Sequence, residues 1–296
     1  KPVKLGYSLK NIPFISSDEA TIGNYKNINK LRINTICKLL KIKPNKISFH
    51  DHHKCHAFYG YFTNPRKNKI VAVVTADGGG DGAYNTVSVF NNGKYKLLSK
   101  SRNNWIGKAY TAVTLILGLN PFRHHYKVMG LAPYTTKKNY SKLLDFFLNT
   151  LKVKGIDFKI NKQATDTYFY FKKNIKYYRF DNIAGALQNF VEKRLLEWFG
   201  NIATKCRTNN FVFSGGVANN VKANKVLAEQ KFINNLWIPP GPGDESLSIG
   251  SVYSYIYETF GPKKTQNYLK SPRDAYWGPD ILNKDILSFK KNSLIK

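Results

Sequence analysis

The sequence predicts an α/β protein, and three observations carry this prediction. Residues 69–76 and 210–213 are apolar runs rich in β-branched or aromatic residues, as buried strands are, and each run leads into a glycine turn. Between the two runs lie segments with apolar residues at helical spacing, the longest at 183–199. With 296 residues and 42% hydrophobic content, the chain is globular and can bury a core as one two-lobed domain or two small ones.

The first elements lead up to a cluster of histidines. Residues 29–40 carry apolar side chains at helical spacing and predict an amphipathic helix. Residues 47–49 predict a short strand, and 52–62 predict a helix that ends at the stop signal Asn64-Pro65.

A β-hairpin is expected next, followed mainly by helices. Residues 69–76 predict a buried central strand that stops at an acidic glycine turn, and 83–90 and 94–99 predict two further strands. For the rest of the chain we expect helices at 108–119, 139–151 and 183–199, a compact loop at 126–134, an irregular stretch at 152–180, a strand at 210–213, and two last helices that end near 229 and 259.

The histidine cluster is a candidate metal site, because four of the six histidines fall within residues 50–56. If this segment is helical, His52 and His56 share one face, one turn apart, and can direct two imidazoles at one cation. Asp77 and Asp244 stand in glycine turns downstream and can complete the site with carboxylates. A solvated histidine cluster is the alternative for the first pair, and a helix N-cap is the alternative for Asp244.

Two glycine turns are candidate ligand-binding loops. Gly78, Gly79 and Gly80 separate two predicted strands, where their backbone N–H groups can approach phosphate oxygens; an ordinary β-turn is the alternative. Gly215 and Gly216 follow a predicted strand and precede a helix, which is a common cradle for an anion or a nucleotide.

The composition of the chain limits the kinds of molecule that we expect it to bind. The net charge is +29, but the lysines are spread along the whole chain, and neither zinc-finger spacing nor an aromatic-basic RNA-binding signature stands out. We therefore expect phosphorylated small molecules rather than nucleic acid. Three widely spaced cysteines suggest a reducing compartment and thus a cytoplasmic location. No apolar run approaches the roughly 18 residues of a membrane span, so no membrane partner is expected.

Five motifs, in order, resemble the carbamoyltransferases of the nodulation-factor and antibiotic-tailoring type, in the actin/Hsp70-like ATPase superfamily. They span about residues 45 to 280, and they are His52-His53-Lys54-Cys55-His56-Ala57, Asp77-Gly78-Gly79-Gly80-Asp81, Tyr126-Lys127-Val128-Met129-Gly130-Leu131-Ala132-Pro133-Tyr134, Ser214-Gly215-Gly216-Val217-Ala218-Asn219-Asn220-Val221 and Pro242-Gly243-Asp244-Glu245-Ser246. The resemblance implies a two-lobed actin/Hsp70-like (ribonuclease-H-like) fold with its N-terminal strand unit missing.

The resemblance also implies a set of site residues. It implies Fe²⁺ or another divalent metal held by His52, His56, Asp77 and Asp244. It implies a nucleotide with its phosphates near Gly78, Gly79 and Gly80 and its sugar and base near Gly215, Gly216, Val217 and Asn219.

The implied reaction is an O-carbamoyl transfer. Carbamoyl-adenylate, made from carbamoyl phosphate and ATP, would pass its carbamoyl group to a substrate hydroxyl, with AMP as the leaving group. We assign His53 to removal of the hydroxyl proton and Lys127 to neutralisation of phosphate charge, with a structural salt bridge as the alternative for Lys127.

The chain departs from the family at several points. Relative to the family, residues 1–280 correspond to part of the transfer domain, with a first lobe at about 1–110 and a second at about 111–280. Residues 281–296 correspond to the start of a linker to a second, absent domain, so the chain is expected to be incomplete. His125 stands where the family has an acidic residue, and Thr135 stands where it has glycine.

Two other functions remain open at this point. One is the related tRNA-modifying transferase that attaches threonylcarbamoyl to adenosine, which shares the histidine pair and the Gly-Gly-Val turn. The other is a nucleotide- or nucleic-acid-binding fragment without catalysis. The acceptor alcohol and the oligomeric state are not indicated by the sequence.

Overall fold

The centre of the fold is a five-stranded mixed sheet. The structure is a computed structural model that describes residues 25–67, 70–161 and 166–272. The strand order is β3-β2-β1-β6-β7; β1, β2 and β3 form an antiparallel meander, and β6 and β7 run parallel to β1. The strands are β1 (Ile70–Gly80), β2 (Ala83–Asn91), β3 (Lys94–Ser101), β6 (Asn210–Ser214) and β7 (Asn235–Trp237).

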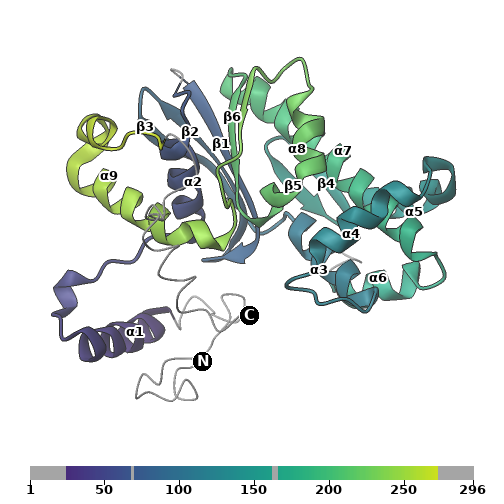
Figure 1. The fold of residues 1–296 in the computed structure, drawn as a ribbon, viewed down its shortest axis with the longest axis horizontal. Coiled ribbons are helices and arrows are strands. Elements are labelled where there is room, and N and C mark those ends of the chain that lie inside the picture. Colours follow the sequence, from purple (N-terminus) through teal and green to yellow (C-terminus); the bar gives the residue numbers. More distant parts are fainter. Residues whose placement is uncertain (1–24, 68–69, 162–165, 273–296) are drawn as a thin grey trace, which may run out of the picture.

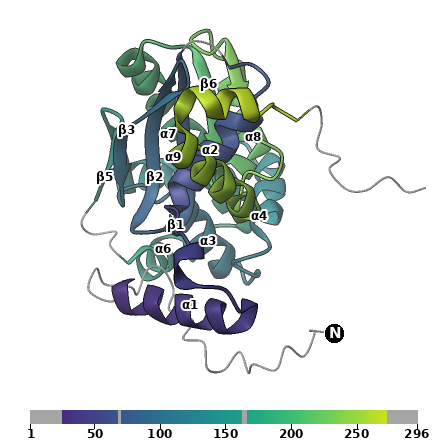
Figure 2. The ribbon, with the colours of Figure 1, turned by 90° about the vertical axis from the view of Figure 1, so that its left-hand side faces the viewer.

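Strand β1 is buried on both faces of the sheet. Successive side chains point to opposite sides of a strand, and each side of β1 contributes to a hydrophobic core. Val71 and Val73 pack on one side against α2 (His52–Thr63) and α9 (Leu247–Tyr268). Val74 and Ala76 pack on the other side into a larger core with α3 (Ile106–Ile116) and α7 (Phe180–Cys206). Figures 1 and 2 show α2 and α9 together on one face of the sheet, with α3 and α7 on the opposite side.

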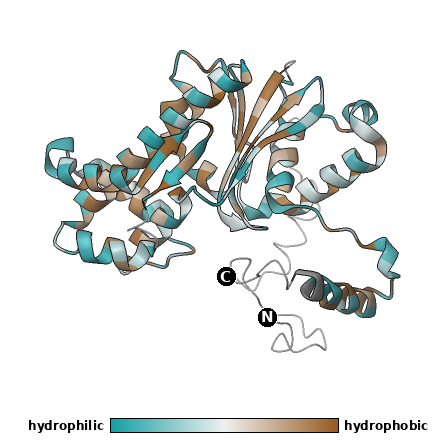
Figure 3. Cartoon of the chain, turned by 180° about the vertical axis from the view of Figure 1, so that it is seen from behind, coloured by the Kyte–Doolittle hydropathy of each residue, from teal (hydrophilic) through white to brown (hydrophobic). Residues whose placement is uncertain are grey.

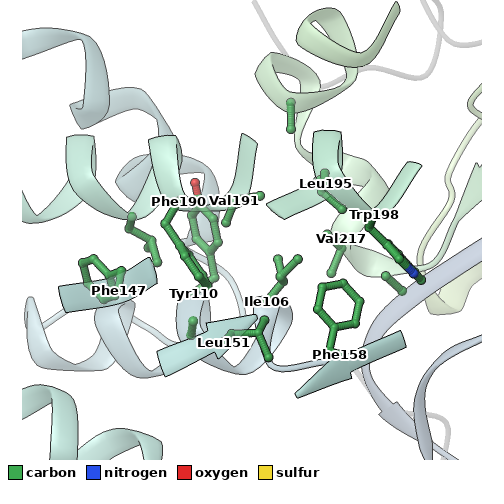
Figure 4. Close-up of a cluster of buried hydrophobic side chains, with 14 of the residues drawn as sticks. Ile106, Tyr110, Phe147, Leu151, Phe158, Phe190, Val191, Leu195, Trp198 and Val217 are labelled. Carbon is green, nitrogen blue, oxygen red and sulfur yellow. The ribbon is translucent and has the colours of Figure 1, made fainter. Parts of the chain in front are cut away.

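The larger core is organised around α7. Phe190, Val191, Leu195 and Trp198 repeat at helical spacing and are buried there, where Figure 4 shows them beside α3 and the β4–β5 hairpin. Seen from behind, hydrophobic residues concentrate in the strands and on the inner sides of the helices, and hydrophilic residues cover the outer sides (Figure 3).

The remaining elements surround this core. They are α4 (His125–Leu131), α5 (Lys137–Thr150), α6 (Thr167–Ile175), α8 (Val221–Ala228) and a small hairpin of β4 (Leu151–Lys154) and β5 (Asp157–Ile160). Helix α1 (Tyr25–Leu40) stands apart from the layers in Figures 1 and 2. None of the described helices is both long and apolar enough to cross a membrane.

The mixed α/β class is confirmed, and so are the expected helices and the strands of the predicted hairpin and of 210–213. The central strand is longer than expected, because β1 continues through the glycines to Gly80. Strands β1 and β6, which come from the two predicted lobes, pair in one sheet, and the boundary near residue 110 stays a prediction.

Three local predictions are wrong. Residues 47–49 have extended backbone at Ile47 but no assigned strand, because they do not join a ladder within the described chain. The predicted loop at 126–134 is helix α4 and a 3₁₀ turn, in which Pro133 occupies a first-turn position that tolerates proline. The described part of 152–180, outside residues 162–165, forms β4, β5 and α6, which are anchored by the buried side chains of Phe158 and Phe171.

Candidate metal centre

Helix α2 presents two imidazoles on one face. Asp51 caps its N-terminus by accepting a hydrogen bond from the Lys54 backbone N–H at 2.9 Å. His52 and His56 lie one turn apart, and their Nε2 atoms are 3.2 Å from each other. The spacing that predicted a shared face is therefore realised in the structure.

Asp77 comes from the end of β1. Its Oδ2 lies 2.9 Å from His52 Nε2 and 3.7 Å from His56 Nε2. Its Oδ1 accepts a hydrogen bond from the Gly216 backbone N–H at 3.0 Å. One carboxylate oxygen thus faces the histidines, while the other fixes the glycine turn after β6.

Asp244 begins the short 3₁₀ turn that precedes α9. Its Oδ1 lies 3.6 Å from His52 Nε2 and 3.5 Å from His56 Nε2, and its side chain is 69% exposed. The alternative role of Asp244 as a helix N-cap is wrong, because Ser246 holds that position at α9 and the turn has no side-chain cap.

These four side chains form a group that fits a divalent cation. Among the described residues, one ligand atom each of His52, His56, Asp77 and Asp244 lies within 4.8 Å of all the others. Bonds of about 2.0–2.2 Å in a tetrahedral site place ligand atoms roughly 3.4 Å apart, close to the distances above. Two imidazoles with two carboxylates suit a borderline or hard divalent ion.

The charges of these four side chains favour a bound proton or cation among them. Burial by itself would raise the pKa of Asp77, but the hydrogen bonds and charges of His52 and His56 hold that pKa far below its usual value. Burial opposes protonation of His56, yet hydrogen bonds with Asp244 and Asp77 raise its pKa above the usual value. Asp77 therefore stays ionised and stabilises a cation, either a proton on His56 or a metal ion in its place.

Ser246 orients His56 from the side away from Asp77. The Ser246 hydroxyl donates to the Gly243 carbonyl at 2.7 Å and lies 3.2 Å from His56 Nδ1. Since its single proton is used, the hydroxyl accepts from Nδ1–H of His56. The lone pair of His56 is then on Nε2, which faces the other three ligands.

Close packing around the centre requires glycine at two positions. A Cβ on Gly80 would lie 2.2 Å from the His52 ring, and a Cβ on Gly215 would lie 2.3 Å from the Ala76 carbonyl oxygen. Gly215 also has φ 92°, a conformation that favours glycine. These glycines shape the site without lining the cavity beside it.

That cavity has a volume of about 1300 Å³ and opens next to the centre. Asp77 and Asp244 line it, and so do four of the residues predicted to bind the nucleotide: Gly78, Gly216, Val217 and Asn219. Gly79, Gly80 and Gly215, also predicted, are not among the lining residues.

The geometry argues against the two catalytic assignments. His53 is fully buried, its Nε2 donates to the Ala83 carbonyl at 3.1 Å, and its Nδ1 lies 2.8 Å from the Thr75 hydroxyl. Burial and the neighbouring His52 lower its pKa to about 4, which favours the neutral imidazole. Lys127 is exposed on α4 and does not line the cavity.

Two cations that the sequence reasoning missed do line the cavity, Arg102 and Lys108. Arg102 Nε donates to the Gly82 carbonyl at 2.7 Å, and the Lys108 ammonium lies 4.2 Å from the Tyr84 ring centroid. The predicted order of three consecutive strands could have indicated both residues. In such a meander β3 runs in the same direction as β1, so residues just after β3 lie at the same end of the sheet as Asp77.

The chain belongs to the carbamoyltransferase family. The family model described as the carbamoyltransferase N-terminus matches residues 14–253, most of the chain. An uncharacterized protein of Methanocaldococcus jannaschii, MJ1058, is 28% identical over 96% of this chain and 51% of its own length. The nodulation protein NolNO of Sinorhizobium fredii is 24% identical over 81% of this chain and 35% of its own length.

The chain spans between 35% and 51% of the length of the curated relatives it matches. Among solved structures, it is similar to full-length HypF in a phosphate- and nucleotide-bound form, with 12% identity, a TM-score of 0.45, and coverage of 80% of this chain and 50% of that one.

Proposed function

We propose that this chain is the transfer part of a metal-dependent O-carbamoyltransferase. In this proposal, carbamoyl-adenylate, made from carbamoyl phosphate and ATP, gives its carbamoyl group to a substrate hydroxyl. The observation that carries the proposal is the convergence of two histidines and two aspartates beside a cavity large enough for a nucleotide. The antiparallel meander continued by two parallel strands supports the actin/Hsp70-like fold that the resemblance implies.

His52, His56, Asp77 and Asp244 would hold Fe²⁺ or another divalent metal. When bound, such an ion supplies Lewis-acid chemistry, polarising the carbamoyl carbonyl and orienting the acyl phosphate oxygen. Asp77 and Ser246 hold the set in place, since Asp77 ties β1 to the turn after β6 and Ser246 fixes the tautomer of His56.

Arg102 and Lys108 take the role first given to Lys127. Both line the cavity and can neutralise the phosphate of the donor, with Arg102 offering a planar pair of N–H groups. Gly78 leaves the backbone open to close approach, since a Cβ there would meet nothing within 4 Å.

The transfer step converts a mixed anhydride, carbamoyl-adenylate, into an ester. The acceptor oxygen attacks the carbamoyl carbon, the bond between that carbon and the AMP oxygen breaks, and the hydroxyl proton passes to solvent water. The product is a carbamate ester, and AMP leaves.

The test supplies carbamoyl-adenylate, Fe²⁺ under anaerobic conditions and a panel of alcohols, and measures AMP release and the carbamate product. We expect release that requires the metal and rises with an alcohol, and that is lost in His56→Ala but kept in Lys127→Gln. Release at equal rates with and without metal would contradict the proposal. A parallel reaction with threonylcarbamoyl-adenylate and tRNA distinguishes the related tRNA-modifying activity.

A further inference from the structure

The cavity is larger than one ligand requires. Pockets for a single drug-sized ligand measure roughly 300–1000 Å³, whereas this cavity measures about 1300 Å³. Its inner part lies against Asp77, Gly216 and Asp244, where the donor is proposed to bind. The outer part is bounded by α3, α4 and the start of α6.

Helix α3 sets the distance between the two parts. Gly107 packs against Asp77, since a Cβ on it would lie 3.1 Å from the Asp77 carbonyl oxygen. Thr111 and Leu115 follow at one-turn spacing and also line the cavity. With a rise of 1.5 Å per residue, they lie roughly 6 and 12 Å further along the helix axis. A ligand on the outer part would therefore adjoin a ligand at the metal centre.

The outer part carries aromatic rings that face solvent. Phe122, in the turn before α4, is 86% exposed, and Tyr126, on α4, is 61% exposed, yet both line the cavity. Tyr168 lines it from α6. Exposed apolar rings beside a cavity commonly mark a ligand-binding surface, and flat rings favour stacking. We call Phe122 and Tyr126 the aromatic platform.

His125, between Phe122 and Tyr126 in the sequence, also lines the cavity and offers a hydrogen-bond acceptor. The Thr111 hydroxyl donates to the Gly107 carbonyl at 3.1 Å and lies 3.2 Å from His125 Nε2. Its proton is used, so Nε2–H of His125 donates to the hydroxyl, and Nδ1 keeps its lone pair. Burial lowers the pKa of His125, which favours this neutral form.

We propose that the outer part of the cavity is the acceptor subsite, where a ring-bearing alcohol stacks on the aromatic platform and donates its hydroxyl to His125 Nδ1. This inference rests on the proposed function, since it assumes that the inner part holds the carbamoyl donor. Stacking on exposed rings selects for a ring with an apolar face, whether aromatic or saturated. The Lys127 ammonium lies beside this surface, 6.0 Å from the centroid of the Tyr126 ring.

The first test measures binding, without any donor or metal. Saturation-transfer NMR compares benzyl alcohol and methyl β-glucoside as ring-bearing probes with glycerol as the ringless one. We expect the ring-bearing probes to bind, and the double variant Phe122→Ala/Tyr126→Ala to weaken them about tenfold. Tyr177→Ala, which changes a ring 87% exposed that does not line the cavity, is the matched control and should change nothing.

Two results of this experiment would overturn the inference. One is that the unaltered protein binds the ring-bearing probes no better than glycerol. The other is a loss of AMP affinity in the double variant, measured by calorimetry, which would assign the platform to the nucleotide. Both binding measurements can be interpreted even if the protein releases no AMP from carbamoyl-adenylate. A failure of the acceptor subsite can therefore be told apart from a failure of the proposed function.

The role of His125 is tested with the full reaction. His125→Gln should lower kcat for transfer to benzyl alcohol at least tenfold, while KM and the NMR signal of the bound ring stay within twofold. An unchanged kcat would remove His125 from the subsite.

Discussion

At the scale of single residues, Gly80 controls the position of a metal ligand. The His52 ring occupies the place where a side chain on Gly80 would be, whereas Gly78 in the same turn faces open space. Gly80→Ala should therefore displace His52 and weaken metal affinity by about 10- to 100-fold, as loss of ligand support commonly does. Metal titration by calorimetry measures this effect. Gly78→Ala is the matched control, and equal losses in both variants would refute the explanation.

His53 should make stability depend on pH. Its pKa is about 4 in the folded protein and 6.5 in the unfolded chain, so below 6.5 the unfolded chain binds a proton that the folded protein does not. The free energy of unfolding should thus fall by about 3 kcal/mol between these two values. His56, whose pKa is raised, acts in a different window, because its contribution is lost as the pH rises above 6.5.

Urea unfolding from pH 7 to 4, in the presence of a chelator, checks this expectation. His53→Gln should flatten the profile in that window relative to the unaltered protein. Parallel profiles would show that His53 is not held in its neutral form.

Prediction of single site residues from the sequence succeeded where the residues lie close together in the chain. The spacing of His52 and His56 needs only a helix to bring both rings together, and α2 supplies it. Arg102 and Lys108, the two cations that line the cavity, could not be found from local spacing, because their place beside Asp77 depends on how the strands pair. Lys127 lies in a motif-like run but faces solvent, whereas Lys108 has no motif and lines the cavity.

At the scale of elements, α3 and α4 present different faces to the cavity. Lys108 on α3 lines it, whereas Lys127 on α4, the lysine that the sequence motif singled out, does not. A charge-assisted hydrogen bond contributes about 1.5–3 kcal/mol, so Lys108→Gln should weaken AMP binding roughly tenfold or more. Lys127→Gln should stay within twofold. Calorimetry with AMP measures both, and the reverse order would restore the original assignment of Lys127.

Long periodic elements were predictable, and short irregular ones were not. Helix α7 repeats its buried residues over many turns, so its period identifies it without tertiary information. Helix α4 has a single buried residue, Val128, and its Gly130 and the Pro133 of the following 3₁₀ turn are typical of a loop. Its helical conformation therefore depends on neighbours that the sequence does not reveal.

At the scale of the whole molecule, the metal centre joins parts of the chain that are far apart. Its ligands come from α2, from the end of β1 and from the turn before α9. A cation bound at 100 times its dissociation constant should raise the free energy of unfolding by about 2.7 kcal/mol. Urea unfolding with and without Fe²⁺ measures this rise, which His56→Ala should abolish. An equal rise in that variant would locate the ion elsewhere.

The same arrangement has a consequence for biosynthesis. Ser246, which orients His56, is 190 residues downstream of it, and Asp244 is almost as far. A nascent chain that has emerged from the ribosome only through the meander already displays His52, His56 and Asp77, but lacks the fourth ligand and the hydroxyl that fixes the tautomer. If these residues bind a metal ion as proposed, its loading is deferred until translation has passed the last glycine turn. A stalled polypeptide would then expose an incomplete set of ligands to free metal ions in the cell.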